Sequence, residues 1–169
     1  MRQGKKKHKV KLSRVLTRDC SFRGISEDDL KYVWASYKKG ALPVDIFPSG
    51  LDVEGFNEVF YDVLASVPFV YILEKDKTPM GIVLSVLTPP RKMEPHVEWF
   101  PWATRRNKLE CAIKFLNEMR KRDILLLIWS KKEATPFFTH IAKYGILHRV
   151  GKVINYNGKK EDAMLFQGR

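Results

Sequence analysis

The chain has 169 residues, of which 44% are hydrophobic, and it is long enough to form one compact domain with a sizeable core. No apolar run approaches the roughly 18 to 20 residues of a membrane helix, and no apolar segment follows the charged N-terminus, so we expect neither a membrane span nor a secretory signal. The net charge is +12, and the two cysteines, Cys20 and Cys111, lie too far apart for a zinc or redox motif, so we expect buried free thiols and no metal site.

Residues 1–18 form a basic tail, which precedes a single domain over residues 19–169. The tail holds eight Lys and Arg residues and no acidic residue. Such a segment attracts polyanions, so DNA or an acidic protein surface is an expected partner, and a solvated tail that aids solubility is the alternative. Its second half, residues 10–16, has enough apolar character to pair as an edge strand, and no motif indicates base-specific readout. The candidate contact residues are Lys5, Lys6, Lys7, Lys9 and Lys11.

Two helices are predicted after the tail. Ser26 is followed by three acidic residues, which is typical of a helix N-cap, and apolar residues then recur at helical spacing as far as Gly40. A turn-rich segment, residues 41–50, leads to a second helix that ends before Pro68. Its apolar side consists of Phe56, Val59, Phe60, Val63 and Leu64.

The pattern then changes to that of β-strands. Residues 69–76 and 79–87 are two predicted strands joined by a short polar turn, the pattern of a hairpin. Residues 88–95 contain three prolines, which lack the backbone donor that a central strand needs. We therefore expect the chain to leave the sheet there and to return to it at residues 96–100.

The C-terminal half alternates helices and strands. Apolar spacing predicts a helix from Asn107, and residues 123–130 predict a strand buried on both faces, and therefore central in the sheet. A helix over residues 134–144 and a hairpin of residues 147–156 and 162–167 follow. Together the elements predict an α+β domain, with a mixed, mostly antiparallel sheet flanked by helices on both faces.

This order of elements resembles the GNAT superfamily of N-acetyltransferases, over about residues 10–167. HVEWFPWATRRN (96–107) and the helix after it resemble the family's fourth strand, pyrophosphate loop and third helix. ILLLIWS (124–130) resembles its fifth strand, and FFTHIAKYGILHRVGKV (137–153) resembles the helix–Gly–strand signature near its C-terminus. The aromatic stretch WFPWATRRN also resembles GNAT-like proteins of tailed bacteriophages.

The resemblance implies acetyl-CoA as the cofactor, with its pyrophosphate at the start of the helix that follows this stretch. A helix N-terminus offers unpaired N–H groups and a positive dipole end. The family's loop contains glycines that this chain lacks, and the side chains of Arg105, Arg106 and Lys108 would compensate by binding phosphate. The alternative is a solvated helix start, in which they pair with Glu110 or other acids. The candidate cofactor-binding residues are Ala103, Thr104, Arg105, Arg106, Asn107 and Lys108.

The resemblance also implies acyl transfer to an amine, whose proton a carboxylate removes. By strand alternation His96, Glu98 and Phe100 share one face, which makes Glu98 the candidate base with His96 beside it. A hydrogen-bonded pair facing solvent is the alternative. The family's catalytic tyrosine corresponds to Ile141, so His140, one residue away, is the candidate acid, unless it simply packs on its helix.

Three functions remain open at this point. The first is an acetyl-CoA-dependent N-acyltransferase of bacteriophage type with an unknown amine acceptor. The second is a catalytically inactive GNAT-fold virion or assembly protein whose tail contacts DNA or a neighbouring virion subunit, and the missing glycines and tyrosine favour it. The third is a nucleic-acid-binding module that uses the tail and the aromatic residues before Arg105. Because the resemblance includes bacteriophage proteins, the expected location is the host cytoplasm or the virion.

Overall fold

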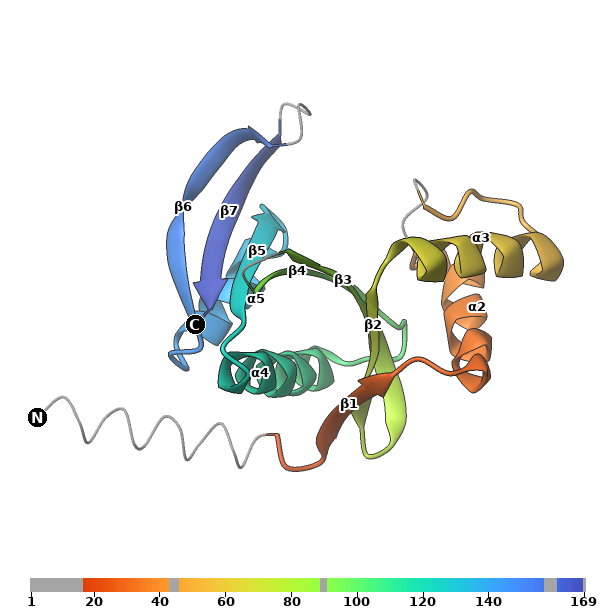
Figure 1. Ribbon diagram of the computed structural model, residues 1–169, viewed down its shortest axis with the longest axis horizontal. Coiled ribbons are helices and arrows are strands. Elements are labelled where there is room, and N and C mark those ends of the chain that lie inside the picture. The colour runs from red at the N-terminus through yellow and green to blue at the C-terminus, as the bar shows by residue number, and fades with distance from the viewer. Residues whose placement is uncertain (1–16, 43–45, 89–90, 157–160, 169) are drawn as a thin grey trace, which may run out of the picture.

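The computed structural model describes residues 17–42, 46–88, 91–156 and 161–168, and its centre is a seven-stranded sheet in the order β1-β2-β3-β4-β5-β7-β6 (Figure 1). The strands are β1 (Cys20–Gly24), β2 (Phe69–Lys75), β3 (Thr78–Thr88), β4 (Lys92–Trp99), β5 (Leu125–Lys131), β6 (Leu147–Tyr156) and β7 (Glu161–Gly168). The helical elements are the 3₁₀ turn η1 (Glu27–Asp29), α2 (Leu30–Lys38), α3 (Val53–Ser66), α4 (Arg105–Lys121) and α5 (Thr135–Ala142). The β4–β5 pair is parallel and the other paired neighbours are antiparallel, which confirms the predicted α+β class with a mixed, mostly antiparallel sheet.

Two hydrophobic cores lie on opposite faces of this sheet. Ile72 and Ile82 pack into the core of α2 and α3, whereas Leu73 and Val83 pack into the core of α4 and α5. Because consecutive side chains of a strand point to opposite faces, the two helix pairs must cover opposite faces. The prediction of helices on both faces is therefore confirmed.

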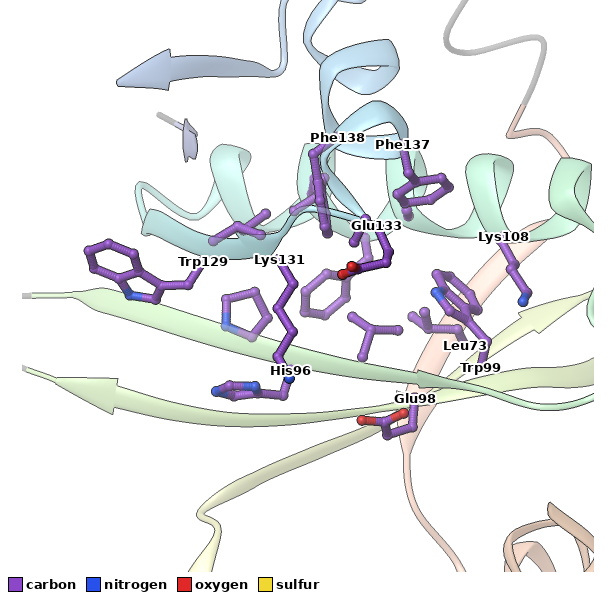
Figure 2. Close-up of a pocket in the computed structure, with 17 residues that line it drawn as sticks. Leu73, His96, Glu98, Trp99, Lys108, Trp129, Lys131, Glu133, Phe137 and Phe138 are labelled. Atoms are coloured by element: carbon purple, nitrogen blue, oxygen red, sulfur yellow. The ribbon is translucent and has the colours of Figure 1, made fainter. Parts of the chain in front are cut away.

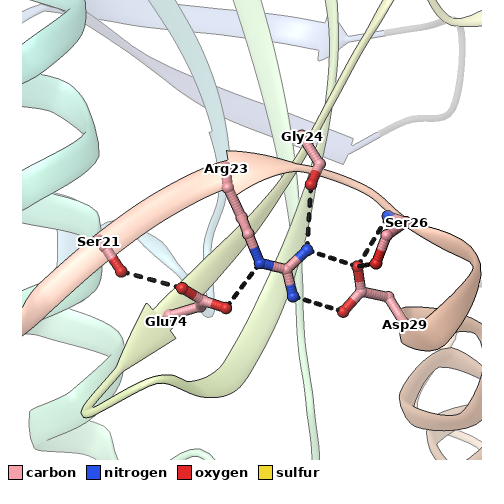
Figure 3. A network of polar contacts seen from close by, with 6 residues as sticks. All are labelled: Ser21, Arg23, Gly24, Ser26, Asp29 and Glu74. Carbon is pink, nitrogen blue, oxygen red and sulfur yellow. Dashed lines mark hydrogen bonds and ion pairs between the residues drawn. The ribbon is translucent and has the colours of Figure 1, made fainter.

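A polar network holds β1, a strand that was not predicted, against the start of α2 (Figure 3). Arg23 on β1 donates to both carboxylate oxygens of Asp29, at 2.7 Å each, and to Oε1 of Glu74 on β2 at 2.8 Å. Asp29 is buried and also accepts hydrogen bonds from the amide and hydroxyl of Ser26. Burial acts to raise the pKa of Asp29, but the hydrogen bonds from Arg23 and Ser26 outweigh it and hold the pKa below its ordinary value.

The prediction that no strand runs through residues 88–95 was wrong for residue 88 and for residues 92–95, whereas Pro89 and Pro90 lie outside the described residues. Strand β3 continues to Thr88, β4 begins at Lys92, and Pro95 lies opposite Ser85 within the β3–β4 pair. The physical reason lies on the other side of β4, which pairs with β5 only at Lys92 and Met93. At Pro95 the strand has a partner on one side only, so a residue without an N–H group is tolerated.

The prediction that β5 is buried on both faces was also wrong, although its central position is confirmed. Burial alternates along the strand, with Leu126 and Ile128 buried and Leu127 and Trp129 only half-buried. The buried side chains face the core of α4 and α5. The other core draws its strand residues from β2 and β3 alone, so α2 and α3 leave the second face of β5 uncovered.

The five lysines expected to contact polyanions, Lys5, Lys6, Lys7, Lys9 and Lys11, lie outside the described residues, as does the apolar segment 10–16. Within the part of the chain that the structure describes, no helix combines the length and apolar character needed to cross a bilayer.

Candidate active site

A cavity opens where β4 and β5 separate. The two strands are paired at Lys92–Leu125 and Met93–Leu126, and their ladder ends there. The space that follows has a volume of about 580 Å³ and lies between the strands, under α4 and α5 (Figure 2). The polar and aromatic side chains around it are His96, Glu98, Trp99, Lys108, Phe115, Trp129, Lys131, Glu133, Phe137 and Phe138.

Strand β4 presents two different faces to this cavity. Val97 and Trp99 pack against the core of α4 and α5, so by alternation His96 and Glu98 point to the opposite face, as predicted (Figure 2). Burial raises the pKa of the Glu98 carboxyl above its ordinary value. Phe100 follows the strand and is fully buried in the core of α2 and α3. The structure thus brings a partly buried carboxylate and an exposed imidazole to one side of the cavity.

The backbone position of Glu98 depends on Gly81 of the neighbouring strand. A Cβ atom at Gly81 would lie 2.8 Å from the carbonyl oxygen of Glu98 and 2.9 Å from the ring of Trp99. Only glycine permits β3 to approach β4 this closely. An isolated glycine within a predicted strand, here residues 79–87, is the sequence signal for such a close approach.

Helix α4 begins two residues earlier than predicted, with Thr104 as its N-cap. The Thr104 hydroxyl accepts a hydrogen bond from the Asn107 amide at 3.2 Å, and its carbonyl accepts from the Lys108 amide at 2.9 Å. The amides of Arg105 and Arg106 have no acceptor among the described residues, as expected for a first helical turn. Lys108 lines the cavity. The helix start therefore offers two free N–H groups, and Lys108 places a cation at the cavity.

The two adjacent arginines differ in their surroundings. Nε of Arg106 donates to Oε1 of Glu110 at 2.7 Å, whereas the exposed Arg105 side chain has no hydrogen bond or ion pair with the described residues. Glu110 is buried and also forms an ion pair with Lys75 at 3.0 Å. Burial acts to raise the pKa of Glu110, but Arg106 and Lys75 together lower it. Pairing with Glu110, the alternative considered for the basic residues, is what the structure shows for Arg106.

The connection between β4 and α4 is anchored to the start of β3. The Phe100 amide donates to the Met80 carbonyl at 2.9 Å, and the Trp102 indole donates to the Pro79 carbonyl at 2.7 Å. Ala103 is buried, and its amide donates to the Phe100 carbonyl at 2.9 Å. Phe100 and Trp102 therefore pack into the hydrophobic cores and tether the connection.

Helix α5 contributes aromatic side chains to the cavity but not the residue that was expected. Phe137 and Phe138 line it, whereas His140 is exposed and lies with its ring 5.7 Å from that of Tyr144. Neither His140 nor Tyr144 lines the cavity, and no tyrosine is among the described residues that do. The same described part of the chain holds no group of three or more His, Cys, Asp or Glu residues placed to bind a metal.

The fold is that of the GNAT N-acetyltransferases, and solved structures of this class match most of the chain. The spermidine N-acetyltransferase of Vibrio cholerae, solved with CoA and spermine, matches with a TM-score of 0.66 and 12% identity, over 89% of this chain and 95% of that one. The ribosomal-protein-alanine N-acetyltransferase of Brucella melitensis matches with a TM-score of 0.59 and 15% identity, over 87% and 98%.

A putative acetyltransferase of Salmonella typhimurium, solved with acetyl-CoA, matches with a TM-score of 0.58 and 11% identity, over 88% of this chain and 92% of that one. No protein-family model and no curated protein sequence matches the chain. The likenesses at this low identity establish the fold, and the sequence resemblance to GNAT proteins is confirmed at that level.

Proposed function

We propose that the chain is an acetyl-CoA-dependent N-acyltransferase that acts on an amine. The observation that carries this proposal is the cavity between the separated β4 and β5, which has a partly buried carboxylate, Glu98, on one side and Lys108 of α4 on another. The similar structures include enzymes named for acetylation of spermidine and of a protein alanine, and two of them hold CoA or acetyl-CoA. An amine is therefore the acceptor class that we propose.

The residues at the start of α4 fit a pyrophosphate. The free amides of Arg105 and Arg106 point out of the first turn, where the helix dipole favours an anion. The Arg105 guanidinium and the Lys108 ammonium add positive charge, which replaces the close backbone approach that glycines give in other family members. Arg106 is held by Glu110, so we expect it to contribute mainly through its amide. When bound, acetyl-CoA supplies an acetyl group activated as a thioester.

Glu98 would accept the proton of the attacking amine. A general base works best when its pKa approaches the working pH, and burial shifts the pKa of Glu98 in that direction. His96 lies two residues away on the same face and is exposed, so it can exchange protons between the cavity and solvent. Trp99, Phe137 and Phe138 exclude water from the other side of the cavity, where the acyl chain would lie.

A second candidate is a non-catalytic GNAT-fold virion or assembly protein encoded by a bacteriophage, present in the host cytoplasm or the particle. Three observations favour it: the Arg106–Glu110 pair, the missing glycines, and the absence of His140 and Tyr144 from the cavity. The sequence resemblance of residues 99–107 to phage proteins supports the source, and the basic tail supports contact with DNA or an acidic subunit.

Calorimetric titration with acetyl-CoA separates the two candidates. We expect micromolar binding by the wild-type chain and a loss of about tenfold or more in the Arg105→Ala/Lys108→Ala double variant, because both side chains would face phosphate. Lys121→Ala is the control, since it removes one positive charge from the opposite end of α4. No binding at millimolar acetyl-CoA would contradict the enzyme and leave the non-catalytic candidate.

Acetyl transfer to a panel of polyamines and peptide N-termini tests the chemistry. Glu98→Gln keeps the size of the side chain and removes the base, so we expect unchanged acetyl-CoA binding and a rate reduced by about a hundredfold or more. A variant that transfers acetyl groups at the wild-type rate would exclude Glu98 as the base.

A further inference from the structure

Cys20 and Cys111 are 91 positions apart in the sequence but adjacent in the fold. Cys20 is the first residue of β1, Cys111 lies on α4, and their Sγ atoms are 3.9 Å apart. The Cys111 thiol also lies 3.4 Å from the carbonyl oxygen of Glu74. Both thiols are free and buried, with exposed fractions of 5% and 1%, so the sequence prediction of buried free thiols is confirmed. Their pairing is the feature that sequence spacing did not indicate.

The surroundings make the two thiols unequal. The hydrogen bond from Cys111 lowers the pKa of Cys20; burial opposes this, and the positive charge of Lys75 lowers the pKa further. The hydrogen bond to Cys20 and burial both raise the pKa of Cys111. Lys75 lies opposite Cys20 in the β1–β2 register and is itself held by Glu110. Cys20 is therefore the thiol that ionises first, with a protonated thiol beside it.

We propose that Cys20 and Cys111 form an oxidation site, which a hydroperoxide converts into an intramolecular disulfide. The Cys20 thiolate attacks one peroxide oxygen, the O–O bond breaks, and Cys20 becomes a sulfenic acid while the rest of the peroxide leaves as alcohol or water. The sulfur of Cys111 then attacks the sulfur of Cys20. The S–S bond forms, and the sulfenic oxygen leaves as water with the Cys111 proton. Two thiols are oxidised by two electrons, and one peroxide is reduced.

The fold permits both steps. A disulfide needs sulfurs at about 2.05 Å, so the two Sγ atoms must approach by roughly 2 Å, which is within the range of side-chain rotation. Cys20 begins an edge strand and follows the turn at residues 17–19. The ends of edge strands open locally far more often than the whole domain unfolds, which gives a small peroxide access to the thiol.

The disulfide would join β1 to α4, the helix whose first turn carries the proposed pyrophosphate site. A cross-link that spans 91 positions removes much conformational freedom from the unfolded chain. We therefore expect the oxidised protein to melt higher than the reduced protein by roughly 5 to 15 °C.

The test treats the reduced full-length chain with stoichiometric hydrogen peroxide. We expect the intact mass to fall by two hydrogens, both thiols to become unreactive, and a non-reducing digest to join the Cys20 and Cys111 peptides. The protein should remain a monomer on a non-reducing gel, melt higher, and recover both thiols with dithiothreitol. Cys111→Ser should stop at a sulfenic acid on Cys20, which dimedone traps, whereas Cys20→Ser should stay reduced.

Several results would overturn the proposal, and the wild-type chain alone is sufficient to reveal them. Both thiols could survive a dose that oxidises glutathione completely. Oxygen atoms could accumulate on one cysteine with no linked peptide, or the linkage could join two chains.

Discussion

Strand β4 has a complete ladder on one side and a short one on the other. It pairs with β3 over eight consecutive positions, from Gly81–Trp99 to Thr88–Lys92, but with β5 over only two. The complete ladder fixes the backbone at Glu98, and the short ladder leaves the cavity in which Glu98 lies. The active site that we propose needs both, because a catalytic side chain must be held in place while the neighbouring strand leaves room for a ligand.

The contrast extends to the two halves of the sheet. The half from β1 to β4 contains the tight β3–β4 approach at Gly81 and the network around Asp29. The other half ends in the edge strand β6, where Val150 and Ile154 are 54% and 71% exposed. We therefore expect substitutions in the first half to lower stability most, and substitutions in the cavity to change function more than stability.

The largest effect on the free energy of unfolding is expected from Asp29→Ala. The substitution removes the buried carboxylate that pairs with Arg23 and Ser26, and should lower the free energy of unfolding by about 3 kcal/mol. Urea denaturation measures this. Asp28→Ala, an exposed neighbour in the same turn, should change the value by less than about 0.5 kcal/mol. Equal effects of the two substitutions would show that the network does not stabilise β1.

The same pair of proteins gives a pH test. The pKa of Asp29 in the fold lies below its value in the unfolded chain, about 3.9. Its contribution to stability should be complete above that unfolded value and lost as the pH falls through the lower, folded value. The difference between wild type and Asp29→Ala should thus be constant from neutral pH to about pH 5 and shrink in stronger acid.

The next effect in size is expected from Gly81→Val, which adds side-chain atoms where the Glu98 carbonyl leaves no room. We expect a loss of about 2 kcal/mol in unfolding free energy, and weaker acetyl transfer because β4 must move. Gly24→Val is the matched control, since a Cβ there would meet nothing within 4 Å. If both glycine variants were as stable as wild type, the tight β3–β4 approach would not be needed.

The smallest effect on the free energy of unfolding is expected from Glu98→Gln, and this variant should be more stable than wild type rather than less stable. Burial raises the pKa of Glu98 in the fold, so its favourable contribution is present below the unfolded pKa, about 4.3, and is lost as the pH rises through the folded value. Near pH 7 the variant should therefore be slightly more stable than wild type, by less than about 1 kcal/mol, and the gain should vanish near pH 4. Thermal denaturation of both proteins at pH 4 and pH 7 measures this difference. A variant that is less stable than wild type at pH 7 would contradict the prediction.

Local sequence patterns predicted most of the fold. The errors lie in segments that are strands because they pair with neighbouring strands. The helices and hairpins follow from periodicity within each segment. Strand β1 has only five residues and β4 contains Pro95, and both are strands because neighbours hold them. Alternation along the strand predicted the face on which Glu98 lies, and pairing of the basic residues with Glu110 was only the alternative to phosphate binding. The contributions of Trp129 and Phe137 to the cavity depend on the separation of β4 and β5, which no local pattern encodes.

The short connection from Phe100 to Thr104 has a consequence for ligand length. It joins the strand that carries Glu98 to the helix that offers the free amides, and hydrogen bonds tie it to Pro79 and Met80. The separation between the carboxylate and the helix start is therefore set by five residues that cannot stretch. If one ligand binds at both groups, as we propose, a residue inserted in this segment would leave each group intact but change the distance between them. The length of the segment would therefore determine how long a ligand must be to reach both.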